Sequence, residues 1–138
     1  MKYYFIKYPE SLPAGWGGET RGPFIKILSK YKNDIGLLEH EKIHVRQWYA
    51  MLALELLVCI LVALFVWPTF WIVCGGAPML HPLLYKLIRP YRQWCEVQAY
   101  REQIRVGGYS SSDFAVAALV EKYNLDLETN EAAALLVG

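Results

Sequence analysis

We predict an α+β fold that is mostly helical, in which a small N-terminal strand region packs on a helix beginning near Ile35. An apolar helical hairpin or insertion separates this helix from a second one. Three observations support the prediction. A chain of 138 residues has room for one domain, which we expect to cover residues 1–138. Proline and glycine punctuate residues 1–22, which favours strands and turns. From Ile35, apolar side chains recur at spacings of three and four, the period of an amphipathic helix.

Residues 23–32, PFIKILSKYK, mix apolar side chains with lysines. We predict a strand here, and an edge strand, because exposed sheet edges often carry lysine. Asn33 and Asp34 then provide turn and cap chemistry for the start of the following helix.

Hydrophobic residues make up 55% of the chain, and the excess is concentrated in residues 50–86. No Asp, Glu, Lys or Arg occurs from Leu56 to Tyr85. Pro68 divides residues 50–86 into two arms of about 17 residues each, which is the lower limit for a helix that spans a bilayer. Three interpretations are open: a transmembrane hairpin, a shallow re-entrant or interfacial hairpin, and a buried helix with an apolar loop in a soluble core.

Further amphipathic helices are predicted after the apolar stretch. The first covers residues 91–108 and ends at the Gly107–Gly108 pair. The second follows the cap residues 110–113, and a short third helix covers residues 129–136.

Charge and composition exclude several classes of protein. The net charge is +1, from 14 basic and 13 acidic residues spread along the chain, so we expect no nucleic-acid partner. The first apolar run is short and reaches Pro9 and Glu10 without a cleavage site, so we expect a protein that is not secreted. Three cysteines without a CxxC pair favour neither a disulfide framework nor a thiolate zinc site.

One motif carries chemistry: His40-Glu41-Lys42-Ile43-His44 has the form H-E-x-x-H. Four residues turn an α-helix by about 400°, so both imidazoles project from one side and can bind one Zn²⁺. The Glu41 carboxylate lies beside them, where it can act as general base towards water that the metal activates.

A catalytic zinc site needs a third protein ligand and an open fourth position. Glu96 is the favoured candidate, because it lies among apolar neighbours in a predicted helix, an unusual place for a carboxylate without a partner. His81 is the rival, although it belongs to what we predict to be an apolar loop. The alternative for Glu96 is an ordinary ion pair with Arg92 or Arg101.

The segments LLEHEKIHVRQW and CEVQAYREQ resemble the gluzincins, metallopeptidases in which HExxH on one helix is completed by a Glu on a second helix. The small minigluzincins and the short phage-encoded metallopeptidases are most similar, over about residues 22–106. The resemblance implies one zinc ion held by His40, His44 and Glu96, with Glu41 as the catalytic base. It also implies that residues 24–30 form the upper rim of the cleft and pair with an extended substrate through a free edge.

The chain departs from the family at one position. Many gluzincins have an Asp four residues after the ligand Glu, where it orients a ligand histidine, and this chain has Tyr100 there. A phenol cannot supply the carboxylate that fixes the imidazole tautomer. The reaction also needs a donor for the developing oxyanion. Tyr49, His81, Tyr91 and Tyr100 are candidates among which the sequence does not choose.

The resemblance therefore implies a zinc-dependent peptidase that hydrolyses peptide bonds of a peptide or protein substrate. One alternative is a catalytically degenerate protein of the gluzincin fold that binds a membrane or accessory partner. Another is an amidase that acts on a non-protein amide.

The stretch of residues 50–86 also resembles the transmembrane segments that membrane-integrated gluzincins place between HExxH and the third ligand. Lys42 and Arg46 precede it, and Lys86 and Arg89 follow it, so both flanks are basic, as cytoplasmic ends are. We expect the hairpin to contact a lipid bilayer with the active site on the cytoplasmic side. A soluble cytoplasmic protein is the alternative.

Overall fold

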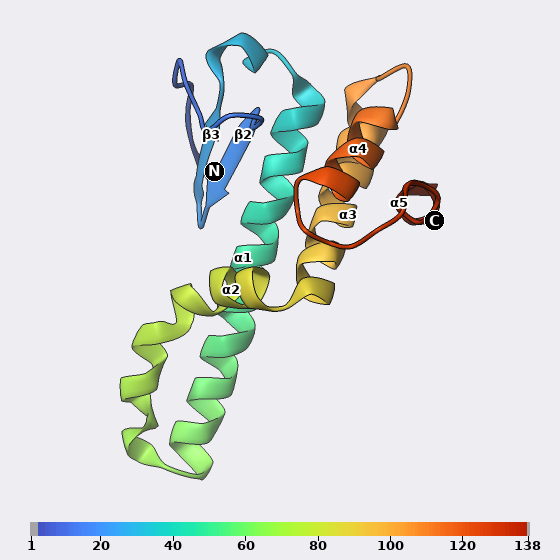
Figure 1. Cartoon of the computed structure of the whole chain (residues 1–138). Coiled ribbons are helices and arrows are strands. Elements are labelled where there is room, and N and C mark those ends of the chain that lie inside the picture. The colour runs from blue at the N-terminus through green and yellow to red at the C-terminus, as the bar shows by residue number, and fades with distance from the viewer. Residues whose placement is uncertain (1–2, 138) are drawn as a thin grey trace.

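The computed structural model describes residues 3–137. It confirms a mostly helical α+β fold with one small sheet (Figure 1). The elements are β1 (Phe5–Lys7), β2 (Gly18–Arg21), β3 (Phe24–Ile27), the 3₁₀ helix η1 (Ser29–Tyr31), α1 (Ile35–Phe65), the 3₁₀ helix η2 (Pro68–Gly76), α2 (Ala77–Leu87), α3 (Arg89–Gly107), α4 (Asp113–Glu121) and α5 (Thr129–Val137).

The sheet has the order β1-β3-β2, with β1 parallel and β2 antiparallel to β3. The prediction that residues 23–32 form an edge strand is wrong, because β3 is central and ends at Ile27. The lysine pattern marks the exposed face of the strand rather than an exposed edge. Lys26 lies beside Glu19 of β2, whereas Ile25 and Ile27 are buried with Val45 against α1.

Helix α1 begins where the sequence predicts. The Asp34 carboxylate caps it by accepting a hydrogen bond of 2.8 Å from the backbone N–H of Leu37. The first half of α1 packs between the sheet and α3 (Figure 1). We call the sheet, this half of α1 and helices α3 to α5 the head of the protein, and the second half of α1 projects from it. At Gly36 the helix approaches α3 so closely that a Cβ would lie 2.9 Å from the carbonyl oxygen of Gln103.

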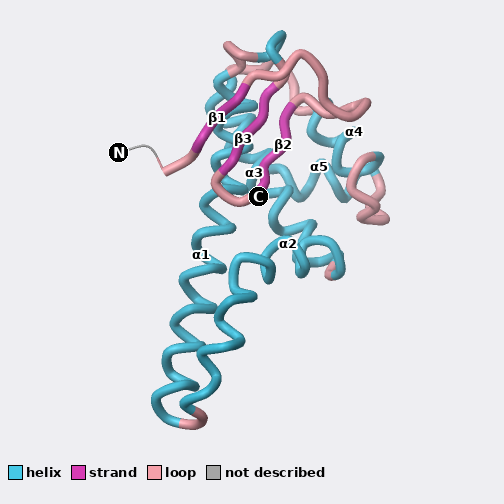
Figure 2. The backbone as a smooth tube through the Cα atoms, turned by 90° about the vertical axis from the view of Figure 1, so that its left-hand side faces the viewer, coloured by secondary structure: helices cyan, strands magenta, loops and turns pink. Residues whose placement is uncertain are grey.

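The second half of α1 and the returning η2 form a hairpin that projects from the head (Figure 2). Pro68 begins the return arm, as predicted. Only 11% of the most apolar 18-residue window of α1 is buried, which places this arm outside the core. By length and composition, α1 is able to cross a membrane.

The expected apolar loop around His81 is instead helix α2, and the prediction of a loop is wrong. Pro78 lies in the first turn, where proline is tolerated. Pro82 lies inside the helix and cannot donate to the carbonyl of Pro78. Nε1 of Trp48 donates to that carbonyl at 3.1 Å, so the group that Pro82 leaves free is satisfied from α1.

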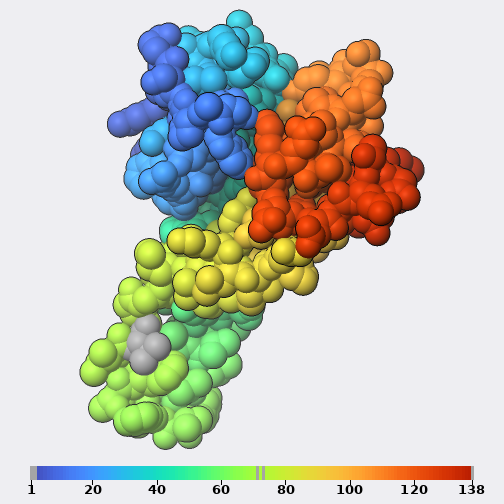
Figure 3. Space-filling model, viewed as in Figure 1, coloured from blue at the N-terminus to red at the C-terminus, as the bar shows by residue number. Residues whose placement is uncertain are grey.

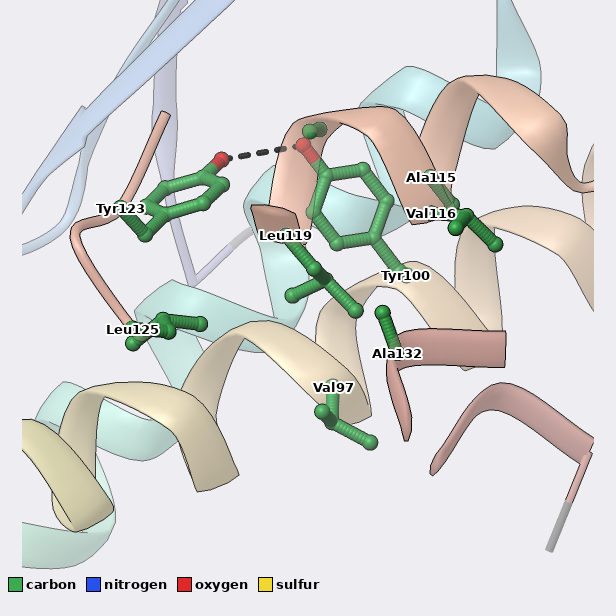
Figure 4. Close-up of a cluster of buried hydrophobic side chains, with 9 residues drawn as sticks. Val97, Tyr100, Ala115, Val116, Leu119, Tyr123, Leu125 and Ala132 are labelled. Atoms are coloured by element: carbon green, nitrogen blue, oxygen red, sulfur yellow. Dashed lines mark hydrogen bonds between the residues drawn. The ribbon is translucent and has the colours of Figure 1, made fainter. Parts of the chain in front are cut away.

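A second core lies between α3, α4 and α5 (Figure 4). Leu119 and Ala115 of α4 are fully buried against Val97 and Tyr100 of α3. Helix α3 ends at Gly107, with Gly108 in the left-handed conformation that favours glycine, as predicted from the Gly107–Gly108 pair. This packing fixes the face of α3 that is turned towards α1.

Candidate metal centre

Three side chains from α1 and α3 converge in the head of the protein. The Nε2 atoms of His40 and His44 are 3.2 Å apart. Glu96 lies opposite, with Oε1 at 3.4 Å from His44 Nε2 and Oε2 at 3.7 Å from His40 Nε2. Among the described residues, these three form the group of His, Cys, Asp and Glu side chains placed to hold a metal ion. The alternative for Glu96, an ion pair with Arg92 or Arg101, is not found among the described ion pairs.

The separations of these atoms fit a small divalent ion. Ligand atoms about 2.1 Å from a tetrahedral zinc ion lie about 3.4 Å from one another, close to the three distances here. Glu96 is 1% exposed, and its Oε2 has no hydrogen-bond partner among the described residues. A buried carboxylate oxygen without a donor is costly, and a cation between the three side chains would satisfy it.

Glu41 lies at the sheet side of this group. Its Oε2 accepts a hydrogen bond of 2.5 Å from the Thr20 hydroxyl on β2. Its other oxygen lies against Gly18, where a Cβ would come within 2.8 Å of the Glu41 Cδ atom. Thr20 and Gly18 were not singled out from the sequence, because nothing local indicates that β2 lies beside the HExxH turn.

Both histidines have a polar neighbour at Nδ1. Nδ1 of His44 is 3.0 Å from Oε1 of Gln47, whose amide nitrogen donates to the carbonyl of Cys95 at 3.1 Å. His40 Nδ1 is buried without a hydrogen-bond partner among the described residues, and so is Oε1 of Gln103, a side chain close enough to act on the pKa of His40. An amide oxygen accepts from the N–H of a neutral imidazole, so both glutamines can fix a tautomer with Nε2 free for a metal.

Tyr100 is not placed to fix the tautomer of a histidine through its hydroxyl group. Its ring contacts His40 edge-on with a centroid distance of 4.5 Å, and its hydroxyl pairs with that of Tyr123 at 3.0 Å (Figure 4). Position 100, four residues after Glu96, is therefore a packing position.

Tyr85 of α2 donates a hydrogen bond to Oε1 of Glu96. The sequence does not point to this residue, since it closes an apolar run and lies in a segment expected to be irregular. The bond orients the carboxylate at Oε1, the oxygen that also faces His44.

Burial and electrostatic coupling move the pKa values of the two imidazoles in opposite directions. Burial, with the neighbouring His44, lowers the pKa of His40 to about 3. Burial also acts to lower the pKa of His44, but the Glu96 carboxylate outweighs it and raises that pKa to about 9. Burial opposes ionisation of Glu96 too, yet the histidines and Tyr85 bring its pKa to about 2. Burial raises the pKa of Glu41 to about 7, against the opposing effects of His44 and Thr20.

The remaining candidates from the sequence lie apart from the three ligands. His81 is buried on α2, where its Nδ1 lies 2.7 Å from the Tyr91 hydroxyl. It lines the cleft but does not join the metal-binding group. Tyr49 is 40% exposed on α1, next to Tyr3 and Arg46 and outside the residues that line the cleft.

A cleft of about 1420 Å³ opens over the site. The loop of residues 10–17 and strand β2 line one side, and α2, α3 and the end of α4 line the other. The loop reaches across the cleft, where Lys122 donates to the carbonyl of Gly15 at 2.7 Å and Trp16 packs edge-on against Tyr123. The strand edge beside the HExxH turn is β2, so the expectation that residues 24–30 offer a free edge is wrong.

No family model, curated protein sequence or solved structure matches this chain. The assignment of a function therefore rests on the site itself.

Proposed function

We propose that this protein is a zinc-dependent peptidase of the gluzincin type, in which His40, His44 and Glu96 bind the metal and Glu41 is the general base. The observation that carries the proposal is the convergence of a distant buried carboxylate on the two histidines of an HExxH helix. Their spacing suits a tetrahedral ion with one position left for water or substrate.

A zinc ion in such a site supplies a Lewis acid that polarises the substrate carbonyl and lowers the pKa of water towards 7. Glu41 accepts the proton from water and passes it to the leaving amine. Its pKa of about 7 suits a group that must both accept and release a proton near neutral pH. Thr20 holds one oxygen of this carboxylate, which leaves the other for the transfer.

The edge strand β2 and the buried His81 complete the proposed site. An extended peptide in the cleft can pair with β2, which lies beside Glu41 and has one free edge. His81 is the favoured donor to the oxyanion among the expected candidates. It is buried and lines the cleft, whereas the hydroxyl of Tyr100 is engaged by Tyr123 and Tyr49 lies elsewhere.

We further propose that the apolar hairpin anchors the enzyme in a bilayer, with the head on the cytoplasmic side. The exterior of the second half of α1 is apolar and largely exposed, as a lipid contact requires. Arg46 before the hairpin and Lys86 after it give both ends the basic flanks of a cytoplasmic face.

The decisive experiment combines metal analysis with turnover in detergent micelles. The wild type is expected to bind one zinc per chain, and His40→Ala and Glu96→Ala are expected to lose it. Glu41→Gln should keep zinc but hydrolyse a randomised peptide library about 100-fold or more slowly, because the general base is lost. Glu121→Gln, at an exposed surface position, is the matched control. Full turnover by Glu41→Gln would contradict the mechanism, and stoichiometric zinc without hydrolysis by the wild type would favour a degenerate binding protein.

A further inference from the structure

Helix α2 has two faces of opposite character. Met79, Leu83 and Leu87 recur every four residues and are 67%, 51% and 68% exposed. At about 100° per residue, His81 and Tyr85 point about 180° away from this apolar stripe. That opposite face is turned inward, since His81 is buried and Tyr85 donates to Glu96. A single helix thus presents apolar side chains outward and polar ones to the metal site.

This helix lies at the junction between the head and the hairpin. In Figure 3 its yellow atoms cross the waist of the molecule, directly above the hairpin. In Figure 1 it runs across α1, which it contacts. The exposed apolar residues of α2 therefore lie at the end of the hairpin that is nearest the head.

The hairpin exterior is compatible with lipid. Glu55 is the one residue among Asp, Glu, Lys and Arg between positions 50 and 85. It is half-buried, and one of its carboxylate oxygens is enclosed by protein. Leu57, Leu61 and Leu64 of the same arm are 52%, 46% and 65% exposed. An apolar surface of this extent on a projecting arm fits hydrocarbon better than water.

Exposed aromatic rings lie at the same level as α2. The turn between β2 and β3 reaches it, because Gly22 packs on the Trp48 ring, and Trp48 donates to the carbonyl of Pro78. Next to this turn, Phe5 and Phe24 stack at 5.3 Å and are 65% and 55% exposed. Exposed Phe and Leu side chains are the groups that interfacial segments bury at the boundary between headgroups and acyl chains.

We propose that α2 lies in the bilayer interface with Met79, Leu83 and Leu87 in the acyl region, so that the cleft opens at the membrane surface and takes polypeptides anchored in the same bilayer as substrates. The substrate assignment rests on the proposed peptidase function, and the placement of α2 rests on the proposed bilayer anchor alone. A helix is about 10 Å across, so the metal ligands lie about 10 Å above the acyl region. An extended chain rises about 3.3 Å per residue, so cleavage falls about three to six residues from the membrane boundary.

The placement of α2 is tested without catalysis. The unmodified protein is reconstituted in phosphatidylcholine–phosphatidylglycerol vesicles that carry a photoactivatable diazirine either near the headgroup or at the acyl end. We expect the headgroup-proximal probe to label Met79, Leu83 and Leu87, and the acyl-end probe to label the hairpin tip. Labelling of the tip with none on α2 would overturn the placement. So would a protein that forms a stable dimer in solution through this surface and takes no label.

The substrate class is tested with two probes that share one randomised eight-residue segment. In the first probe this segment joins directly to a transmembrane anchor of about 20 apolar residues, and in the second it is free in solution. We expect the anchored probe to be cleaved about tenfold faster or more, because confinement raises its effective concentration. In a third probe, a 30-residue spacer separates the randomised segment from the anchor. Because the segment then lies far from the membrane boundary, we expect it to be cleaved more slowly than in the first probe.

The outcomes separate the two proposals. Equal cleavage of free and anchored probes would overturn the substrate assignment and leave the peptidase function intact. Cleavage of neither probe by zinc-loaded protein would overturn the peptidase function and the substrate assignment together. The double variant Leu83→Glu/Leu87→Glu, at two exposed positions outside the cleft lining, should lose the preference for the anchored probe and keep activity on the free one. Ile35→Glu, an exposed apolar residue at the far end of α1, is its matched control.

Discussion

Tyr85 donates a hydrogen bond to Oε1 of Glu96, the same oxygen that lies 3.4 Å from Nε2 of His44. The donor belongs to α2 and the acceptor to α3. The segment that follows the apolar hairpin thus takes part in orienting the third ligand of the proposed metal centre.

Replacing Tyr85 by Phe should weaken zinc binding about tenfold or more, because hydrogen bonds that hold a ligand carboxylate tune its orientation. The affinity can be measured by competition with a chromophoric chelator. Tyr91→Phe removes a hydroxyl that pairs with His81 rather than with a ligand, so it should leave zinc affinity unchanged. Equal affinities for the two variants would show that the Tyr85 bond does not support the metal.

Gly18→Ala should reduce turnover about tenfold or more while zinc stays bound. The added methyl group would overlap the Glu41 carboxylate and displace the proposed base, since the three atoms nearest to it all belong to the Glu41 side chain. Gly17→Ala is the matched control, because its Cβ would lie 3.3 Å from the Tyr31 ring rather than against Glu41. Single-turnover rates with metal content measured in parallel test this, and a rate equal to that of the wild type would contradict it.

Zinc binding should release about one proton per site at pH 7.5. In the metal-free protein Glu96 raises the pKa of His44 to about 9, and a metal requires the neutral imidazole. The apparent affinity should therefore rise with pH up to about 9. Calorimetry in two buffers of different ionisation enthalpy measures the proton count. Glu39→Gln, outside the ligand set, should leave that count unchanged, and a count near zero for the wild type would refute the assignment.

The same pKa shift has a consequence for the stability of the metal-free protein. The pKa of His44 is higher in the folded state than its ordinary value of 6.5. Its contribution to stability is therefore complete below pH 6.5 and is lost as the pH rises through about 9. The pKa of Glu96 is lowered, so its contribution is present above pH 4.5 and is lost as the pH falls through about 2.

Asp34→Ala should lower the free energy of unfolding by about 1–2 kcal/mol. The carboxylate caps α1 and also accepts a hydrogen bond of 2.5 Å from the Tyr109 hydroxyl, which ties the helix start to the segment after α3. Asn33→Ala, an exposed neighbour, is the control. Denaturant unfolding in micelles, followed by near-ultraviolet dichroism of the head, should separate the two variants.

Local patterns predicted much of this structure. The cap at Asp34, the helical spacing of His40 and His44 and the end of α3 at Gly107 each depend on residues a few positions apart. Glu96 was identified because a carboxylate among apolar neighbours needs a partner, and the structure brings it to the histidines.

Contacts between distant segments were beyond the sequence. Nothing near Thr20 or Gly18 indicates that β2 lies beside Glu41, and nothing near Gln103 indicates His40. The helix around Pro82 was missed for a similar reason, since its free carbonyl is satisfied by Trp48 from another element. Such pairings are set by tertiary packing rather than by local periodicity.

Helix α1 contains neither glycine nor proline from Leu37 to Phe65, so the two proposed metal ligands and the apolar arm share one stiff rod about 44 Å long. No joint separates the two halves. A change in the tilt of the arm must then swing His40 and His44 through the same angle, while Glu96 follows a different helix. In the proposed zinc-bound, bilayer-anchored protein, the thickness and curvature of the bilayer would therefore act on the geometry of coordination through the tilt of the arm.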